Sequence, residues 1–146
     1  MKKITMLLIA LFVAAGVFAQ TEVTPAQVIF NCGDKKVTLK EAKTEGVQLP
    51  QSLEIEVVFS DSETAKLNSE NVTFEFRWFY YMSTKKTLMA TNTIAVDSAA
   101  DNDGLVRVVC EKKNARKGWW EVQVKCKTND SPVVFAGTKE FSILLK

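Results

Sequence analysis

Hydrophobic and polar residues alternate along most of this chain with the period of two that is typical of β-strands. The clearest case is residues 104–127, where two alternating arms flank the polar segment 111–118, which ends in a glycine. Val106 and Val108 share one face of the first arm, and Trp120 and Val122 share one face of the second. Because β-branched residues at this period disfavour a helix, the pattern predicts a β-hairpin with one buried face.

The same alternation recurs in short runs that are separated by turn signals, and no long run has the period of a helix. Besides the two hairpin arms, the predicted strands are 26–32, 52–60, 71–81, 87–98, 133–135 and 138–146. Residues 36–42 form a short strand or part of a loop, residues 20–27 a loose lead-in, and residues 61–70 a polar loop with at most one helical turn. Seven to nine short strands predict an all-β fold, an antiparallel immunoglobulin-like sandwich, with a small closed barrel as the alternative.

The first nineteen residues do not follow this pattern. Lys2 and Lys3 precede an apolar stretch, and Ala19 places a small residue directly before Gln20. This arrangement is typical of a secretory signal peptide, and the apolar stretch is short for a membrane-spanning helix. We therefore expect a signal peptide at 1–19, one domain at 20–146, a periplasmic or secreted location, and no membrane span after cleavage.

Charge and composition narrow the range of functions. The chain has 19 Lys and Arg residues against 17 Asp and Glu, and loss of Lys2 and Lys3 with the signal leaves 17 against 17. A neutral domain without a clustered basic face is a poor candidate for binding nucleic acid. The sequence contains no histidine, no glycine-rich phosphate loop and no C-x-x-C pair, so imidazole-based catalysis and thioredoxin-like chemistry are excluded. We expect neither enzymatic activity nor a cofactor.

Carboxylates and cysteines are the other reactive groups. Residues 97–104 place Asp and Asn oxygens at a spacing that suits calcium, but they lack the EF-hand pattern, and we interpret them as a turn without a metal. Cys110 and Cys126 lie at opposite ends of the predicted hairpin, so they are not expected to pair. In an immunoglobulin-like sandwich Cys32 would lie at the same end as Cys110, which predicts a Cys32–Cys110 disulfide; three buried free thiols are the alternative.

Aromatic and basic residues provide the candidate binding surfaces. Phe79, Tyr81 and Trp119 occupy the rows opposite the core-facing tryptophans, so they form an exposed platform if their strands share a sheet. Sugars stack on such rings, and protein partners use them as anchors; cover by a loop or a bulge near Trp119 is the alternative. The polar segment adds four cations that suit an anionic glycan or lipid headgroup, or form a solvated turn: Lys112, Lys113, Arg116 and Lys117.

Three segments together resemble a known group of proteins. FRWFYY at 76–81 is followed by GWWEVQV at 118–124 and by KEFSI at 139–143. The combination, over residues 71–146, resembles immunoglobulin-like sandwich domains of exported Bacteroidetes-type proteins of unknown function. The resemblance implies the fold and an envelope setting, and it carries no catalytic residues.

These observations predict a non-catalytic envelope protein that acts as a binding or structural module for a protein or glycan partner. One alternative is a carbohydrate-binding protein, which needs two or more exposed coplanar rings. Another is a subunit of an extracellular assembly such as a fimbria. Such a subunit needs an unpaired apolar edge strand, for which residues 138–145 are the candidate.

Overall fold

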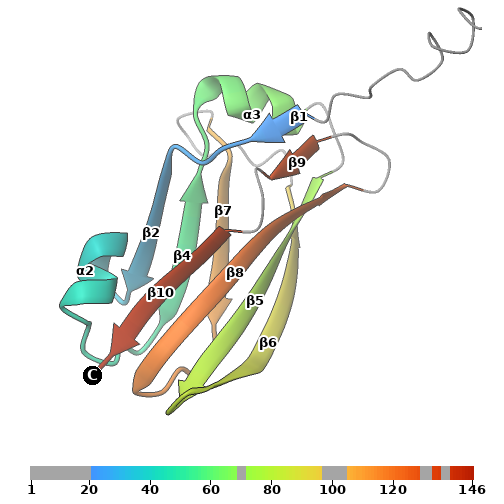
Figure 1. The fold of residues 1–146 in the computed structure, drawn as a ribbon. Helices are drawn as coiled ribbons and strands as arrows, with labels where there is room; N and C mark the ends of the chain where they lie inside the picture. Colours follow the sequence, from blue (N-terminus) through green and yellow to red (C-terminus); the bar gives the residue numbers. More distant parts are fainter. Residues whose placement is uncertain (1–20, 69–71, 97–104, 129–132, 136–138) are drawn as a thin grey trace, which may run out of the picture.

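The computed structural model describes residues 21–68, 72–96, 105–128, 133–135 and 139–146. One sheet contains, in spatial order, β3 (Lys35–Thr38), β2 (Gln27–Cys32), β4 (Leu53–Val58) and β7 (Arg107–Lys112). The other contains β10 (Lys139–Leu145), β8 (Gly118–Thr128), β5 (Val72–Met82) and β6 (Lys85–Ala95). All pairings inside the two sheets are antiparallel, and the sheets face each other (Figure 1), which confirms the predicted all-β sandwich.

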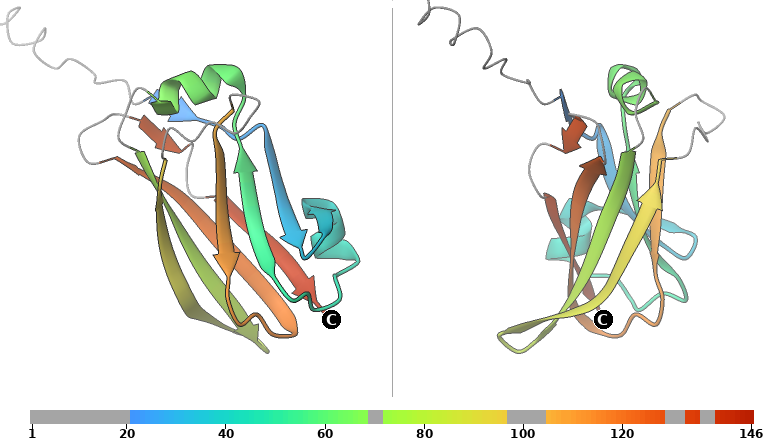
Figure 2. Two further views of the ribbon diagram at one scale, coloured as in Figure 1. Left: turned by 180° about the vertical axis from the view of Figure 1, so that it is seen from behind. Right: turned by 90° about the vertical axis from the view of Figure 1, so that its right-hand side faces the viewer.

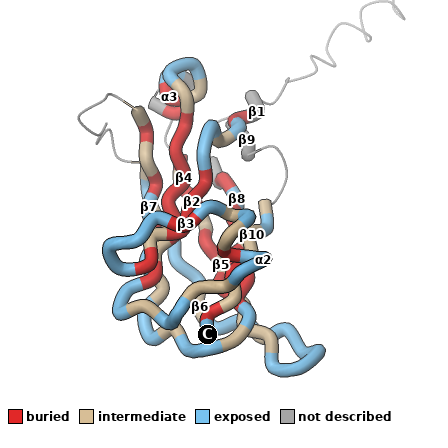
Figure 3. The backbone as a smooth tube through the Cα atoms, turned by 90° about the vertical axis from the view of Figure 1, so that its left-hand side faces the viewer, coloured by how far each residue is buried: buried red, intermediate tan, exposed pale blue. Residues whose placement is uncertain are grey.

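The core lies between the two sheets because each strand buries alternate residues. Trp78 and Trp120 from the second sheet and Phe30 and Ile55 from the first are at most 1% exposed. Figure 3 shows that β4 and β2 are buried along most of their length, whereas exposed residues gather at the turns near the C-terminus. Burying one large apolar side chain contributes about 1.5–3 kcal/mol, so these inner rows hold the two layers together.

The predicted hairpin at 104–127 is wrong. β7 pairs with β4, whereas β8 pairs with β5 and β10, so the two arms belong to different sheets. Residues 113–117 cross from one layer to the other, as the side view in Figure 2 allows the reader to follow. Both arms bury one face, and alternation alone does not distinguish a neighbour in the same sheet from one in the facing sheet about 10 Å away.

Helical structure was underestimated in two places. Residues 36–42 form the end of β3 and the start of α2 (Leu39–Thr44), and the polar loop predicted at 61–70 contains α3 (Asp61–Asn68). At α2, Thr38 accepts a hydrogen bond from the Glu41 amide, and the Glu41 carboxylate accepts one from the Thr38 amide at 2.9 Å. This reciprocal cap is encoded by T-x-x-E in the sequence, a helix-start signal that the strand pattern obscured.

The lead-in predicted at 20–27 also differs from the structure. Thr21–Val23 forms β1, which pairs in parallel with β9 (Val133–Phe135), and β2 already begins at Gln27. Val23 is fully buried, so burial of its side chain explains why this polar stretch is ordered. The predicted signal peptide at 1–19 and the carboxylates at 97–104 lie outside the described residues.

All three cysteines are free and buried, so the predicted Cys32–Cys110 disulfide is not formed. Cys32 lies at the end of β2 and Cys110 lies on β7, and β4 separates these strands. Two strands with a third between them are about 9–10 Å apart, which exceeds the roughly 7 Å Cα separation that a disulfide tolerates. The two cysteines do lie near the same end of the sandwich, as predicted, but they are not neighbours.

The edge strand predicted at 138–145 is only partly open. β10 is at the edge of its sheet, but Val47 and Leu49 pair with its last residues. The Val47 amide donates to the Leu144 carbonyl at 2.8 Å, and the Leu49 amide donates to the Lys146 carbonyl at 3.0 Å. Among the described residues, no helix is long and apolar enough to cross a membrane.

Candidate functional site

The outer face of the sheet formed by β10, β8, β5 and β6 carries all three rings of the predicted platform. Phe79 pairs with Glu121, and Tyr81 and Trp119 follow on the same face towards the end of the sandwich where the C-terminus lies (Figure 1). The condition set by the sequence, that the two strands share a sheet, is therefore met. Trp119 is 40% exposed, whereas Phe79 and Tyr81 are half-buried.

Phe79 is not available as a bare stacking surface. The Lys86 ammonium lies 4.5 Å from the centre of its ring, and the Arg77 guanidinium lies 5.3 Å from the same point. Cations at these distances are attracted to the electron-rich face of an aromatic ring. The exposed aromatic surface is therefore centred on Trp119 and Tyr81 rather than on all three residues.

Glu121 is the polar centre of this face and is only 7% exposed. Its carboxylate accepts hydrogen bonds from the Tyr81 hydroxyl at 2.8 Å and from the Gln123 amide at 3.2 Å, and it forms an ion pair with Lys86. Burial alone would raise the pKa of Glu121, but the hydrogen bonds from Lys86, Tyr81 and Gln123 outweigh it and lower that pKa. The hydrogen bond to Glu121 is also the main reason why the pKa values of Tyr81 and Lys86 are raised.

A shallow cleft of about 270 Å³ opens beside this network. Its lining residues come from α2, β5, the β5–β6 turn, β8 and β10. Its lining residues are Lys43, Tyr81, Ser83, Trp119, Trp120 and Ser142. The cleft thus combines an exposed indole with an ammonium group and two serine hydroxyls, a mixture of apolar surface and hydrogen-bonding groups that suits a polar ring-shaped ligand.

Sequence reasoning missed half of this cleft. Lys43 reaches it only because α2 exists and packs beside β10. The T-x-x-E signal at Thr38 marks the start of that helix in the sequence. No local signal brings Ser142 to the cleft, because its position depends on the pairing of β10 with β8.

The four predicted cations of the polar segment divide into two kinds. Lys112 lies 5.0 Å from the centre of the Trp120 ring, and Arg116 lies 4.1 Å from the centre of the Tyr80 ring. Burial, and secondarily the charge of Arg116, lower the pKa of Lys112. Lys113 and Lys117 are exposed. Lys112 and Arg116 therefore contact aromatic rings at the end of the sandwich, although Arg116 is itself an exposed residue.

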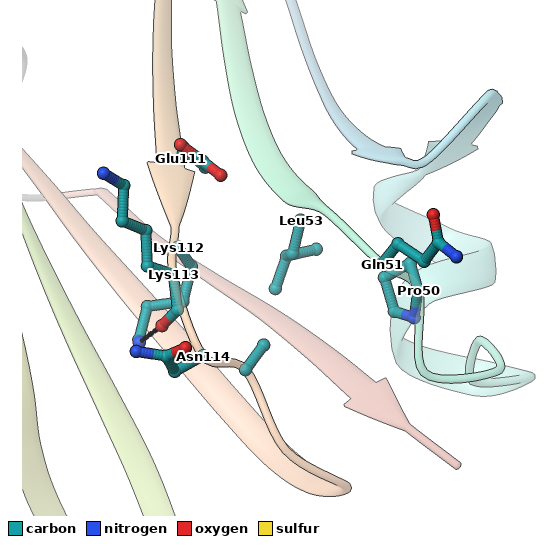
Figure 4. A pocket seen from close by; sticks show the side chains of 8 residues that line it. Pro50, Gln51, Leu53, Glu111, Lys112, Lys113 and Asn114 are labelled. Atoms are coloured by element: carbon teal, nitrogen blue, oxygen red, sulfur yellow. Dashed lines mark hydrogen bonds between the residues drawn. The ribbon is translucent and has the colours of Figure 1, made fainter.

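A second cavity lies at the same end, between the start of β4 and the end of β7 (Figure 4), and measures about 300 Å³. The residues that line it are Pro50, Gln51, Leu53, Glu111, Lys112, Lys113, Asn114 and Ala115. It contains no exposed aromatic ring, and Glu111 balances part of its positive charge. It therefore offers a ligand fewer kinds of contact than the cleft beside Trp119, which has an exposed ring as well as polar groups.

The part of the chain that the structure describes holds no cluster of three or more His, Cys, Asp or Glu residues arranged to hold a metal ion. No family model matches the sequence, and a search of curated proteins finds no significant match. The resemblance to exported immunoglobulin-like domains therefore stays a prediction.

Proposed function

We propose that this protein is a non-catalytic, exported module of the cell envelope that binds a glycan in the cleft between α2 and the second sheet. The observation that carries the proposal is the 40% exposure of Trp119 at the rim of this cleft. A tryptophan that remains exposed beside a concave, partly polar surface favours a binding role over a purely structural one.

The chemistry of the cleft supports a saccharide as the ligand class. One face of a pyranose ring is lined with C–H groups that pack on an indole, and its hydroxyls need donors and acceptors close by. Trp119 supplies the apolar surface, while Lys43 and Ser142 supply hydrogen-bonding groups around it. Tyr81 is held by Glu121, so binding does not have to order that ring.

Substitution of Trp119 tests the site. On a glycan array the purified protein should bind a defined set of saccharides, and Trp119→Ala should weaken that binding at least about tenfold, or about 1.4 kcal/mol. Val109→Ala is the matched control, because Val109 is also 40% exposed but lies on the other sheet. Equal loss in both variants, or no array signal from the unsubstituted protein, would contradict glycan binding at this cleft.

We also propose that the sandwich is immunoglobulin-like. If β2, β4 and β7 are strands A, B and E, the second sheet has the order G, F, C, C′. Strand D of the constant-type arrangement has no counterpart, and β3 adds a strand beside A. This order supports the classification, and superposition of an experimental structure on known immunoglobulin domains tests it.

The assembly-subunit alternative has less support. A donated strand would have to displace Val47 and Leu49 from the end of β10 before it could pair there. Electron microscopy of the native cell surface would show this protein in filaments if the alternative were correct.

A further inference from the structure

β6 is an unusual strand for a sandwich of this size. None of its eleven residues is buried, and among the described strands β6 hydrogen-bonds with β5 alone, while β7 contacts part of it from the facing sheet. Leu88 and Met89 are 44% and 43% exposed, and together with Met82 they account for three of the six large hydrophobic residues that the structure shows as exposed. An edge that exposes apolar side chains and backbone groups together favours pairing with another strand.

The backbone direction of the open edge follows from one hydrogen bond. The Val96 amide donates to the Val72 carbonyl at 2.8 Å, so these two residues form a hydrogen-bonded antiparallel pair. Because backbone groups alternate along a strand, Ile94 and Asn92 also face β5. Thr91 and Thr93 then direct their N–H and C=O groups away from β5, towards the open edge.

Lys85, Lys86 and a register shift between Leu88 and Ala90 protect the first part of β6, but the remainder of the strand offers little protection against pairing. Residues 87–95 contain no charged residue, no proline and no glycine, and three of the nine are threonines. Charges, prolines and short length are the usual means of preventing edge association. The other edges have such protection: β3 is only four residues long, β7 carries the charged residues Arg107 and Glu111, and the end of β10 is covered.

We propose that two copies of this chain associate through β6 in an antiparallel ladder around a two-fold axis at Asn92. In this register Thr91 of one copy pairs with Thr93 of the other, and each threonine lies opposite a threonine. The two-fold arrangement also places Lys85 and Lys86 of the two copies at opposite ends of the ladder. A parallel arrangement in register would bring these like charges side by side, at an unfavourable energy.

The dimer would form one continuous eight-stranded sheet. The axis of a two-fold antiparallel pair is perpendicular to the sheet, so both copies keep the same face outward. The two clefts beside Trp119 would then open on the same side of the assembly. A surface carrying repeated ligands would be bound by both clefts at once, which raises the effective affinity without a new contact.

Proline substitution at the open edge tests the interface. Thr93→Pro removes an N–H that points away from β5, and prolines are tolerated on edge strands. By analytical ultracentrifugation the unsubstituted chain, with its N-terminus determined by mass spectrometry, should have twice the chain mass at micromolar concentration. Thr93→Pro should be a monomer with the circular dichroism spectrum of the parent, and the matched variant Thr93→Val, which keeps the N–H, should stay a dimer. A monomeric parent, or a dimer that survives Thr93→Pro, would overturn the proposal.

Cross-linking gives a positive test of the register. Asn92 lies on the proposed axis in a non-hydrogen-bonded pair, where Cα atoms are about 4.5 Å apart, within the range of a disulfide. Asn92→Cys should therefore form a covalent dimer under mild oxidation on a non-reducing gel, and Lys85→Cys, at the end of the strand, should not. A monomeric Asn92→Cys protein, or equal cross-linking of both variants, would overturn the two-fold arrangement at Asn92.

Discussion

At the scale of single residues, Glu121 has the largest influence on the candidate site. It is an acidic side chain in the middle of a sheet face, and such residues on strands are usually solvated. Here Tyr81, Lys86 and Gln123 surround it, so its charge is compensated and the ring of Tyr81 is fixed at the cleft. The same hydrogen bonds therefore stabilise this face of the sheet and hold Tyr81 in place at the cleft.

Replacing Glu121 with glutamine should destabilise the protein by about 1–3 kcal/mol, because Tyr81 and Lys86 lose a charged hydrogen-bond acceptor at a buried position of the sheet face. The free energy of unfolding in urea measures this loss. Glu111→Gln is the control, since Glu111 is an exposed strand residue on the other sheet, away from this network. A change below about 0.5 kcal/mol in both variants would show that the network contributes little.

The same network predicts a dependence on pH. The folded pKa of Glu121 is lowered, so its contribution is complete above about pH 4.3 and is lost as the pH falls through the lower folded value. The folded pKa values of Lys86 and Tyr81 are raised, so their contributions are complete below about pH 10 and are lost as the pH rises through the higher folded values. A plot of melting temperature against pH should therefore fall less steeply at both extremes of pH for Glu121→Gln than for the unsubstituted protein.

At the scale of elements, the crossing from β7 to β8 decides the architecture. Gly118, the first residue of β8, has a backbone φ of +126°, a value that residues with a side chain rarely adopt. A Cβ at this position would lie 2.6 Å from the hydroxyl oxygen of Tyr80, which itself donates to the Lys117 carbonyl at 2.7 Å. The crossing therefore requires glycine both for its backbone angle and for space.

Gly118→Ala should cost about 1–3 kcal/mol from backbone strain, and more if the Tyr80 ring is displaced. Gly33→Ala provides the comparison, because Gly33 also has a positive φ of +62° but nothing within 4 Å of a Cβ there. The cost at Gly33 should be about 1 kcal/mol. Thermal and urea unfolding measure both, and equal costs at the two positions would contradict the role assigned to Tyr80.

At the scale of the whole molecule, hydrophobic packing stabilises the sandwich without a disulfide. Cys32, Cys110 and Cys126 are each at most 7% exposed and lie on inner rows of the sheets. Burial raises the pKa of the Cys32 and Cys110 thiols, which reduces their reactive thiolate fraction. The protein should therefore keep three thiols even in an oxidising compartment.

Thiol titration checks this expectation. The denatured protein should react with three equivalents of a thiol reagent, the native protein should react slowly, and a reductant should leave the melting temperature unchanged. A single reactive thiol after denaturation, together with a lower melting temperature in reductant, would instead indicate a disulfide.

Part of the candidate site was predictable from local patterns. Alternation placed Phe79, Tyr81 and Trp119 on the rows opposite the buried tryptophans, and the structure places all three on one outer face. The availability of each ring was not predictable. Lys86 covers Phe79 because β6 folds back beside β5, and a local pattern does not specify what a neighbouring strand brings.

The sequence by itself determined the strands, the buried and exposed faces and the all-β class, because side-chain alternation is a local property of each strand. The T-x-x-E signal also encoded the start of α2, although the strand pattern around it concealed the helix. Only the tertiary structure decided which strands are neighbours. Whether β7 pairs with β8 or faces it across the core depends on burial against residues that are distant in the sequence. The order of the strands also keeps Cys32 and Cys110 apart and brings Lys43 and Ser142 to Trp119 in one cleft.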